Sequence, residues 1–185
     1  MGERTPVAEQ SLVGDGTGAT HWAQASERLG TPERDRSYWL ATVRPDGRPH
    51  VMPILGLWLD GAFLFITGEG TRKGRNLADN PQCVVTASSH ALPALDIIVE
   101  GEATKVTDEA KLRRVADAYG SELHWQLAVR DGVVFGDNAP TAGPPPYAVF
   151  ELTPTTVFGL PGVAGTDEGS PEGSEGTITP TRWRF

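Results

Sequence analysis

The sequence predicts a mainly β protein with a few helices, folded as a small β-barrel or a barrel-like sandwich. Short runs of apolar, aromatic and β-branched residues recur over residues 38–106 and again after residue 147, each ending at a Gly, Pro, Asp or Asn signal. Helical patterns are few by comparison. Many short strands at near-regular spacing are typical of barrels and two-layered β architectures.

The chain of 185 residues is long enough for one domain with a full core. Its 22 glycines and 15 prolines accompany a hydrophobic fraction of only 38 %, and two polar segments are rich in glycine. We predict a flexible N-terminal tail over residues 1–19 and one folded domain over residues 20–185, with a mobile loop over residues 161–176.

Composition and motifs exclude several classes of protein. The chain has no secretory signal and no apolar run of bilayer length, so we expect a cytoplasmic protein without a membrane partner. Its net charge of −8 argues against nucleic acid as the main partner. The four histidines show no metal-ligand spacing, and Cys83 lies in an apolar run typical of a core residue. Motifs for acyl transfer and nucleotide hydrolysis are absent.

The first half of the domain is predicted to begin with an amphipathic helix and to continue as a meander of three antiparallel strands. Arg44-Pro45-Asp46-Gly47 and Asp60-Gly61 provide the two turns. The predicted elements are a helix over Trp22–Leu29 and strands over Tyr38–Val43, Arg48–Leu59 and Ala62–Thr67.

The second half is predicted to alternate strands with two helices. Thr71 and Asp108 are expected N-caps, and Asn80-Pro81 and Gly120 are expected stops. Residues 121–146 lack a strong pattern and fit a variable, substrate-facing insertion. The predicted strands are Cys83–Ser88, Asp96–Val106, Tyr147–Leu152, Thr156–Gly159 and Thr177–Phe185.

A cluster of cations stands at the start of the short helix that follows strand Ala62–Thr67. Arg72, Lys73 and Arg75 fall within four residues, next to Thr71. A helix N-terminus offers free N–H groups and a positive dipole end, and arginine and lysine add charge-assisted hydrogen bonds to an anion. The alternative is a solvated basic face. The acidic background of the chain favours an anion socket, a term that we use for Thr71, Arg72 and Lys73.

Two prolines interrupt the predicted strand Arg48–Leu59. Pro49 and Pro53 each remove a donor from the strand ladder, so part of this strand should lie at a sheet edge. The backbone of His50-Val51-Met52-Pro53 could then form hydrogen bonds with the edge of a planar heterocycle. The alternative is an ordinary edge strand that proline protects against aggregation.

Taken in order, these features resemble the pyridoxamine 5′-phosphate oxidase-like family of split β-barrel flavoproteins. The resemblance covers Tyr38–Val106 and rests on the strand–turn–strand pattern, Thr67, Gly70-Thr71-Arg72-Lys73 and Asn80-Pro81. Three further stretches look most like the flavin/deazaflavin oxidoreductases, which bind FMN or coenzyme F420. They are Leu40-Ala41-Thr42, Lys73-Gly74-Arg75-Asn76-Leu77 and Thr181-Arg182-Trp183-Arg184-Phe185.

The resemblance implies a homodimeric split β-barrel with FMN or F420 in grooves between the subunits. Its cofactor-binding positions fall on the strand segment His50, Val51, Met52 and Pro53, on the phosphate positions Thr67, Thr71, Arg72 and Lys73, and on Asn76, Trp183 and Arg184. Asn76 lies one helical turn beyond Arg72. Catalytic side chains are not assigned, because such a cofactor carries the hydride chemistry itself.

Two departures from the family pattern bear on the reaction. The oxidases have an arginine and a lysine where this chain has Val51 and Gly56, and their C-terminal substrate-phosphate arginines have no counterpart here. The resemblance therefore argues against pyridoxal phosphate synthesis. The leading hypothesis is a reductase that passes hydride from reduced F420 or FMN to a small unsaturated or quinone-like molecule. Alternatives are a non-catalytic flavin, F420 or haem carrier, and an interaction module.

Overall fold

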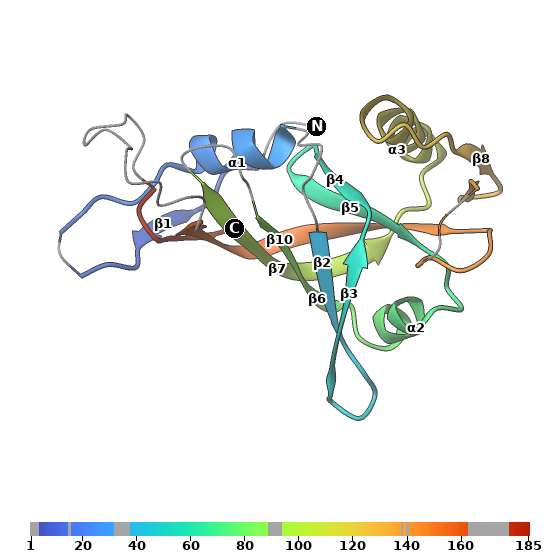
Figure 1. Ribbon diagram of the computed structural model, residues 1–185, viewed down its shortest axis with the longest axis horizontal. Coiled ribbons are helices and arrows are strands. Elements are labelled where there is room, and N and C mark those ends of the chain that lie inside the picture. Colours follow the sequence, from blue (N-terminus) through green and yellow to red (C-terminus); the bar gives the residue numbers. More distant parts are fainter. Residues whose placement is uncertain are drawn as a thin grey trace, which may run out of the picture.

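The computed structural model describes residues 4–14, 16–31, 38–88, 94–137, 139, 141–162 and 178–185. These residues form eleven strands and three helices, which confirms a mainly β protein (Figure 1). The elements are β1 (Ala8–Ser11), α1 (Trp22–Gly30), β2 (Tyr38–Val43), β3 (Pro49–Ile54), β4 (Gly56–Leu59), β5 (Ala62–Thr67), α2 (Arg72–Asp79), β6 (Gln82–Ser88), β7 (Leu95–Lys105), α3 (Glu109–Glu122), β8 (Ala128–Arg130), β9 (Val133–Phe135), β10 (Ala148–Pro161) and β11 (Thr181–Arg184).

Nine strands form one antiparallel sheet around the long strand β10. The main path runs β1-β11-β10-β7-β6-β2-β3, and β5 pairs with both β10 and β4. The first part of β10 therefore lies between β5 and β7, and its last part between β11 and β7. The register with β7 shifts between Pro154 and Thr156, where a bulge separates these two parts.

The sheet is open rather than closed into a barrel. The predicted strand Arg48–Leu59 is two strands: β3 pairs with β2, whereas β4 pairs with β5, and only Leu55 separates them in sequence. Among the described residues, β3 and β4 do not pair with each other. The expectation of a small β-barrel is therefore wrong as to closure, because the chain crosses from one sheet edge to another at Leu55.

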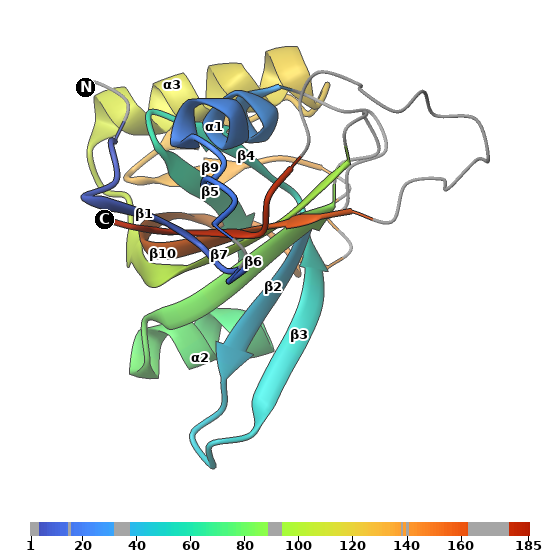
Figure 2. The ribbon, with the colours of Figure 1, turned by 90° about the vertical axis from the view of Figure 1, so that its left-hand side faces the viewer.

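The three helices cover different parts of the sheet. Figure 2 shows α1 and α3 on one side and α2 on the other, beside β2 and β3. One buried cluster centres on the aromatic rings of Trp22, Phe63, Phe65 and Trp183. A second lies under α3 and includes Leu112 and Tyr119. The α2 helix lies on the other side of the sheet, and its Leu77 belongs to the first cluster.

The structure confirms both predicted N-caps. Thr71 Oγ1 accepts a hydrogen bond from Gly74 N (3.1 Å), and Asp108 Oδ1 accepts one from Lys111 N (2.8 Å). Gly120 does not end α3, which continues to Glu122. These caps fix where α2 and α3 begin.

Other expectations about the chain ends and the late strands need correction. The two predicted strands after residue 147 are a single strand, β10. Part of the expected N-terminal tail forms β1, which pairs with β11, and the Glu9 carboxylate accepts a hydrogen bond from Trp22 N at 2.8 Å. Most of the predicted mobile loop over residues 161–176 lies outside the described residues.

Candidate functional site

The turn from β5 into α2 fixes two hydroxyl groups at the helix N-terminus. Thr67 ends β5 and is fully buried, and its Oγ1 lies 3.0 Å from Thr71 Oγ1. Thr71 Oγ1 donates to Gly68 O (2.8 Å) while it accepts from Gly74 N. Because Thr71 donates to a carbonyl, the Thr67 hydroxyl is the donor to Thr71. The first turn of α2 is therefore held rigidly against the end of β5.

Lys73 is the most unusual side chain of the anion socket. It is only 3 % exposed, and its Nζ donates to the backbone carbonyl of Thr141 at 2.5 Å. Among the described residues no carboxylate forms an ion pair with Lys73. Burial lowers the pKa of its ammonium group, because water no longer stabilises the charge. A buried ammonium with one neutral partner is costly unless an anion completes its surroundings.

A polar chain links α2 to strands β2 and β3. Asn76 Nδ2 donates to Thr42 Oγ1 (2.9 Å), and Thr42 lies directly opposite His50 in the β2–β3 register. Thr42 Oγ1 is also 3.5 Å from His50 Nδ1. Asn76 is 1 % exposed, and its Oδ1 is buried without a hydrogen-bond partner. That oxygen is an acceptor for which the described residues provide no donor.

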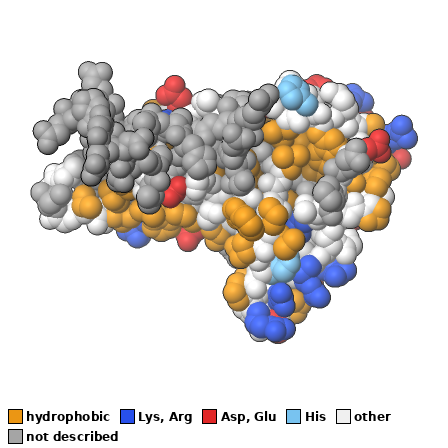
Figure 3. Space-filling view, in the orientation of Figure 1, with side chains coloured by type: hydrophobic (Ala, Val, Ile, Leu, Met, Phe, Trp, Pro, Cys, Tyr) orange, Lys and Arg blue, Asp and Glu red, His pale blue; other side chains and the backbone are white. Residues whose placement is uncertain are grey.

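Three cations from two elements act on His50. Its pKa is lowered, first by burial and then by the charges of Arg44, Lys73 and Arg72, so the imidazole is neutral at neutral pH. Arg44 belongs to the β2–β3 turn, and its buried Nε has no hydrogen-bond partner in the described part of the chain. Figure 3 shows basic side chains gathered over this end of the molecule. The cations converge although the whole chain is acidic.

Six of the predicted site residues come together around this cluster. Thr67, Thr71, Arg72 and Lys73 lie at the start of α2, Asn76 follows one turn later, and His50 faces them from β3. Strand β3 lies at the edge of the sheet, as its prolines predict. Val51 and Pro53 are exposed on β3 and Met52 is half-buried.

The predicted C-terminal residues do not join the cluster within the chain. Trp183 is completely buried, its Nε1 donates to Thr20 O (3.1 Å), and its ring lies against Trp22. Arg184 is exposed at the end of β11, where it pairs with Thr156 of β10. Both residues therefore belong to the β1–β11–β10 side of the sheet.

Sequence reasoning missed Thr42, Arg44 and Thr141. A usable signal was the spacing of Thr42, on β2, and Arg44, directly after it, because residues two apart on an extended chain point to the same side. Arg44 was instead interpreted only as a turn residue. Nothing in the sequence pattern indicates that the carbonyl of Thr141 lies against Lys73.

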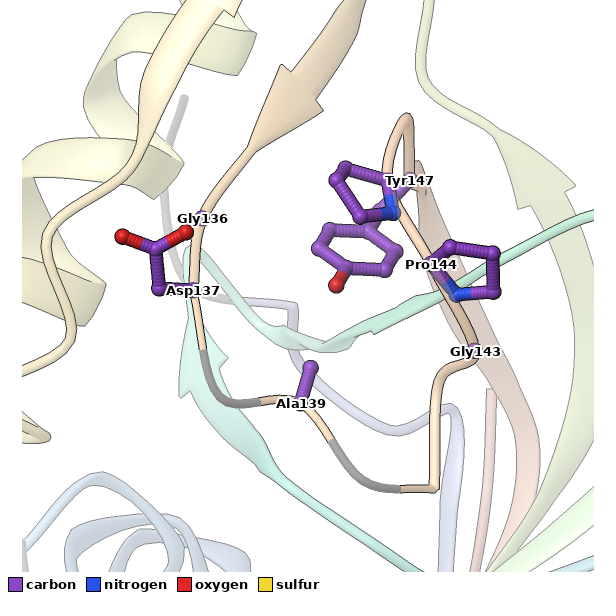
Figure 4. A pocket seen from close by; sticks show the side chains of 7 residues that line it. Gly136, Asp137, Ala139, Gly143, Pro144 and Tyr147 are labelled. Carbon is purple, nitrogen blue, oxygen red and sulfur yellow. The ribbon is translucent and has the colours of Figure 1, made fainter.

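A pocket of about 570 Å³ lies next to the anion socket, between β9 and β10 (Figure 4). Its described lining residues are Gly136, Asp137, Ala139, Gly143, Pro144, Pro145 and Tyr147. The wall at Gly143 touches the socket, since a Cβ added there would lie 3.4 Å from the Thr71 methyl group. Residues 121–146, left without a pattern in the sequence, thus contribute to a pocket beside the candidate site.

Within the described part of the chain, no helix is long and apolar enough to span a bilayer. The same residues contain no group of three or more His, Cys, Asp or Glu side chains suited to a metal ion.

Comparison with known proteins gives one family and one fold. A family model described as pyridoxamine 5′-phosphate oxidase matches residues 29–160. A pyridoxine/pyridoxamine 5′-phosphate oxidase of Bacteroides thetaiotaomicron is 41 % identical over 71 residues, which are 38 % of this chain and 33 % of the relative. The chain thus matches one third of the length of that enzyme.

Solved structures share the fold at low sequence identity. A conserved hypothetical protein from Mycobacterium tuberculosis superposes with a TM-score of 0.57 at 18 % identity, covering 86 % of this chain and 94 % of that one. A haem-binding protein from Mycobacterium smegmatis gives a TM-score of 0.57 at 17 % identity, covering 80 % and 57 %.

Proposed function

Because this chain belongs to the pyridoxamine 5′-phosphate oxidase family, we propose that its anion socket holds the phosphate of FMN or coenzyme F420 for a reductase reaction. The observation that carries the proposal is Lys73, a buried cation whose described surroundings offer one carbonyl and no carboxylate. A phosphate beside it would supply the missing negative charge.

The residues around Lys73 fit a phosphorylated, hydroxyl-bearing cofactor. Arg72 and Arg44 add positive charge near His50, and the N-terminus of α2 adds its dipole. Asn76 Oδ1 is a buried acceptor that a cofactor hydroxyl group could satisfy. The edge backbone of β3 is open for hydrogen bonds to the rim of a planar ring. These groups support the proposal for the phosphate, one hydroxyl group and the ring edge of a flavin-like molecule.

A bound flavin or deazaflavin supplies the hydride chemistry, and the protein orients the ring and excludes water. We infer a small unsaturated or quinone-like molecule as the acceptor. F420 is favoured over FMN because Arg44 extends the cations beyond what one phosphate requires, and F420 has an anionic tail beyond its phosphate. Arg75 is committed in part to Gly70, since its Nη1 donates to Gly70 O at 2.5 Å.

Pyridoxal phosphate synthesis is not part of the proposal. The oxidases that this sequence resembles have a lysine at the position of Gly56. A lysine would not fit here, because a Cβ at Gly56 would collide with the Phe63 ring and lie 2.7 Å from Leu64 O. Val51, at the position of their arginine, carries no charge for a cofactor or substrate.

We also propose that two copies of the chain associate through the outer face of β2 and β3. Trp39 and Val51 are 47 % and 51 % exposed, and the register places them on the same face because Trp39 lies opposite Pro53 and Ala41 opposite Val51. An exposed apolar surface of this kind is typical of an interface. Replacing Trp39 by Asp should then shift the molar mass measured by light scattering from dimer to monomer, and an unchanged mass would contradict this interface.

The decisive experiment is identification of the cofactor on freshly purified protein. A flavin or deazaflavin absorption spectrum, with the matching mass after release, would support the proposal. A Soret band would favour a haem carrier, and a colourless protein that binds neither FMN nor F420 would favour an interaction module.

Variants of the socket test the residue assignment separately. Replacing Arg72 and Lys73 together by Ala should abolish measurable cofactor binding. Arg48→Ala is the matched control, because Arg48 forms an ion pair with Asp46 (2.7 Å) and does not act on His50. Unchanged cofactor affinity in the double variant would overturn the assignment of the socket.

A further inference from the structure

The pocket beside the socket is attached to it by the polypeptide backbone. Lys73 Nζ donates to Thr141 O at 2.5 Å, and Gly68 N donates to Ala142 O at 2.9 Å. These two bonds fix the loop between β9 and β10 to both ends of the β5–α2 turn. Because Gly143 and Pro144 of that loop line the pocket, one wall of the pocket is held by the side chain that forms the base of the socket.

The lining of the pocket is chemically unlike the socket. Glycine, alanine and proline make up most of its walls, and Tyr147 contributes its ring. Figure 4 shows the Tyr147 ring between Asp137 and Pro144, with its hydroxyl group directed toward the side of Ala139. Such a lining of small apolar groups with few polar atoms is typical of sites for small organic molecules.

Two polar side chains set the charge preference of the pocket. Asp137 is the only charged side chain among the described lining residues, and the described part of the chain gives it no ion pair. Tyr147 remains a hydroxyl donor at neutral pH, because burial and the charge of Asp137 raise its pKa. A ligand carbonyl or hydroxyl can therefore accept from Tyr147. The exposed Asp137 carboxylate, which Figure 4 draws on the side of its backbone away from Tyr147, disfavours a carboxylate or phosphate through its charge.

We propose that this pocket is a second binding site, for a flat, mainly apolar molecule that carries no negative charge. If the socket holds the cofactor phosphate as proposed, this molecule binds next to the phosphate end of the cofactor, because the loop that Lys73 anchors lines both sites. Binding itself does not depend on that function. The two sites therefore differ in the charge of the group that they bind. The anion binds at the start of α2, and the neutral or cationic ring binds between β9 and β10.

The test uses three probes that share one ring system and differ in charge: 2-naphthalenemethanol, 2-naphthylmethylamine and 2-naphthoate. Binding to the full chain is followed by two-dimensional amide NMR, with and without FMN or F420. The indole N–H of Trp125 is a built-in reporter, because it donates to the Asp137 carbonyl (2.6 Å) and its ring lies 6.0 Å from Tyr147.

We expect the amine and the alcohol to shift the Trp125, Gly136 and Gly143 signals, and the amine to bind on the order of tenfold more tightly than the naphthoate, as a single nearby carboxylate would produce in partly hydrated surroundings. Asp137→Asn should remove most of this preference. Asp131→Asn is the control, since it removes one carboxylate from the exposed β8–β9 turn, where a positive φ of 52° suits asparagine.

Tyr147→Phe should weaken the alcohol several-fold and leave the amine less affected. Equal affinities for the three probes, an unchanged preference in Asp137→Asn, or signal shifts away from the pocket would each overturn the proposal. If the probes bind as expected but neither FMN nor F420 binds, the pocket stands as a ligand site and the proposed function of the socket fails.

Discussion

Replacing Lys73 by Met separates the effect of this buried charge on stability from its contribution to phosphate binding. In the ligand-free protein Lys73 is buried with one hydrogen bond, to a carbonyl at the exposed residue Thr141, which water can reach once the bond is gone. Loss of a hydrogen bond to a charged group destabilises the folded state by about 1.5–3 kcal/mol. The variant also avoids the desolvation penalty of burying an unpaired ammonium, and this gain offsets the loss. We expect the unfolding free energy of the ligand-free variant to be unchanged or about 1 kcal/mol higher.

The same substitution should weaken phosphate binding strongly. Without the ammonium, a bound phosphate loses a charge-assisted hydrogen bond of about 2–3 kcal/mol, which corresponds to a loss of affinity of about 30- to 150-fold. Titration with FMN and with riboflavin isolates this effect, because riboflavin lacks the phosphate. The variant should bind riboflavin like the wild type and lose most of the additional affinity for FMN.

The pH dependence of stability provides an independent check. Burial lowers the pKa of Lys73 in the folded protein below its value in the unfolded chain, so between these two values the unfolded chain holds more protons. The stability of the ligand-free wild type should therefore rise as the pH increases toward 10.5, and the difference from Lys73→Met should shrink over that range.

Lys111→Met is the matched control, because it removes the same charge from α3 and breaks an ion pair with Glu151 of 2.6 Å. It should leave FMN affinity unchanged and lower stability. A fall of more than about 1 kcal/mol in the stability of ligand-free Lys73→Met, or an equal loss of FMN and riboflavin affinity, would refute this account of Lys73.

Three further predictions concern the surroundings of the socket. NMR titration should give His50 a pKa below 6.5; Arg44→Ala should raise it, because Arg44 is the strongest of the charges acting on it, whereas Arg48→Ala should not, and equal shifts would argue against convergence on His50. Gly68→Ala should destabilise the protein by about 1–3 kcal/mol in urea unfolding, because its Cβ would lie 2.5 Å from a loop carbonyl, while Gly70→Ala, which meets nothing within 4 Å, should stay within about 0.5 kcal/mol. The Cys83 thiol, whose pKa burial raises to about 12, should react with a thiol reagent at pH 8 only on unfolding, and rapid labelling of the native protein would contradict its burial.

Local signals in the sequence were sufficient for the elements that build the socket. The strand over residues 38–43 and the caps at Thr71 and Asp108 follow from side chains within a few positions of each element. Thr71 caps α2 because its own hydroxyl reaches Gly74 N, a contact that needs no distant partner. The predicted start of α2, with its cap at Thr71, therefore matches the structure.

Features that depend on distant segments could not be predicted. The apolar pattern runs from β3 into β4 almost without a break, and nothing local indicates that each half pairs with a different strand. The sequence was interpreted as two late strands, but pairing with β7 carries β10 through a bulge between Pro154 and Thr156. Trp183 was assigned to the cofactor from resemblance alone, whereas its ring fills the space over Gly159 and against Trp22.

The position of β10 at the centre of the sheet has a consequence for how the protein is made. Thr67, the strand end that leads into the socket, pairs with Ala148, and the same strand goes on to pair with β7 and β11. When the ribosome has synthesised β2 to β7, every residue of the anion socket is present. The segments that hold it in place, Thr141 and β10, are not yet made. Contacts this distant in sequence slow folding and leave early segments exposed. The contacts of Lys73 with Thr141 and of Thr67 with Ala148 can therefore form only after the chain has been synthesised as far as β10.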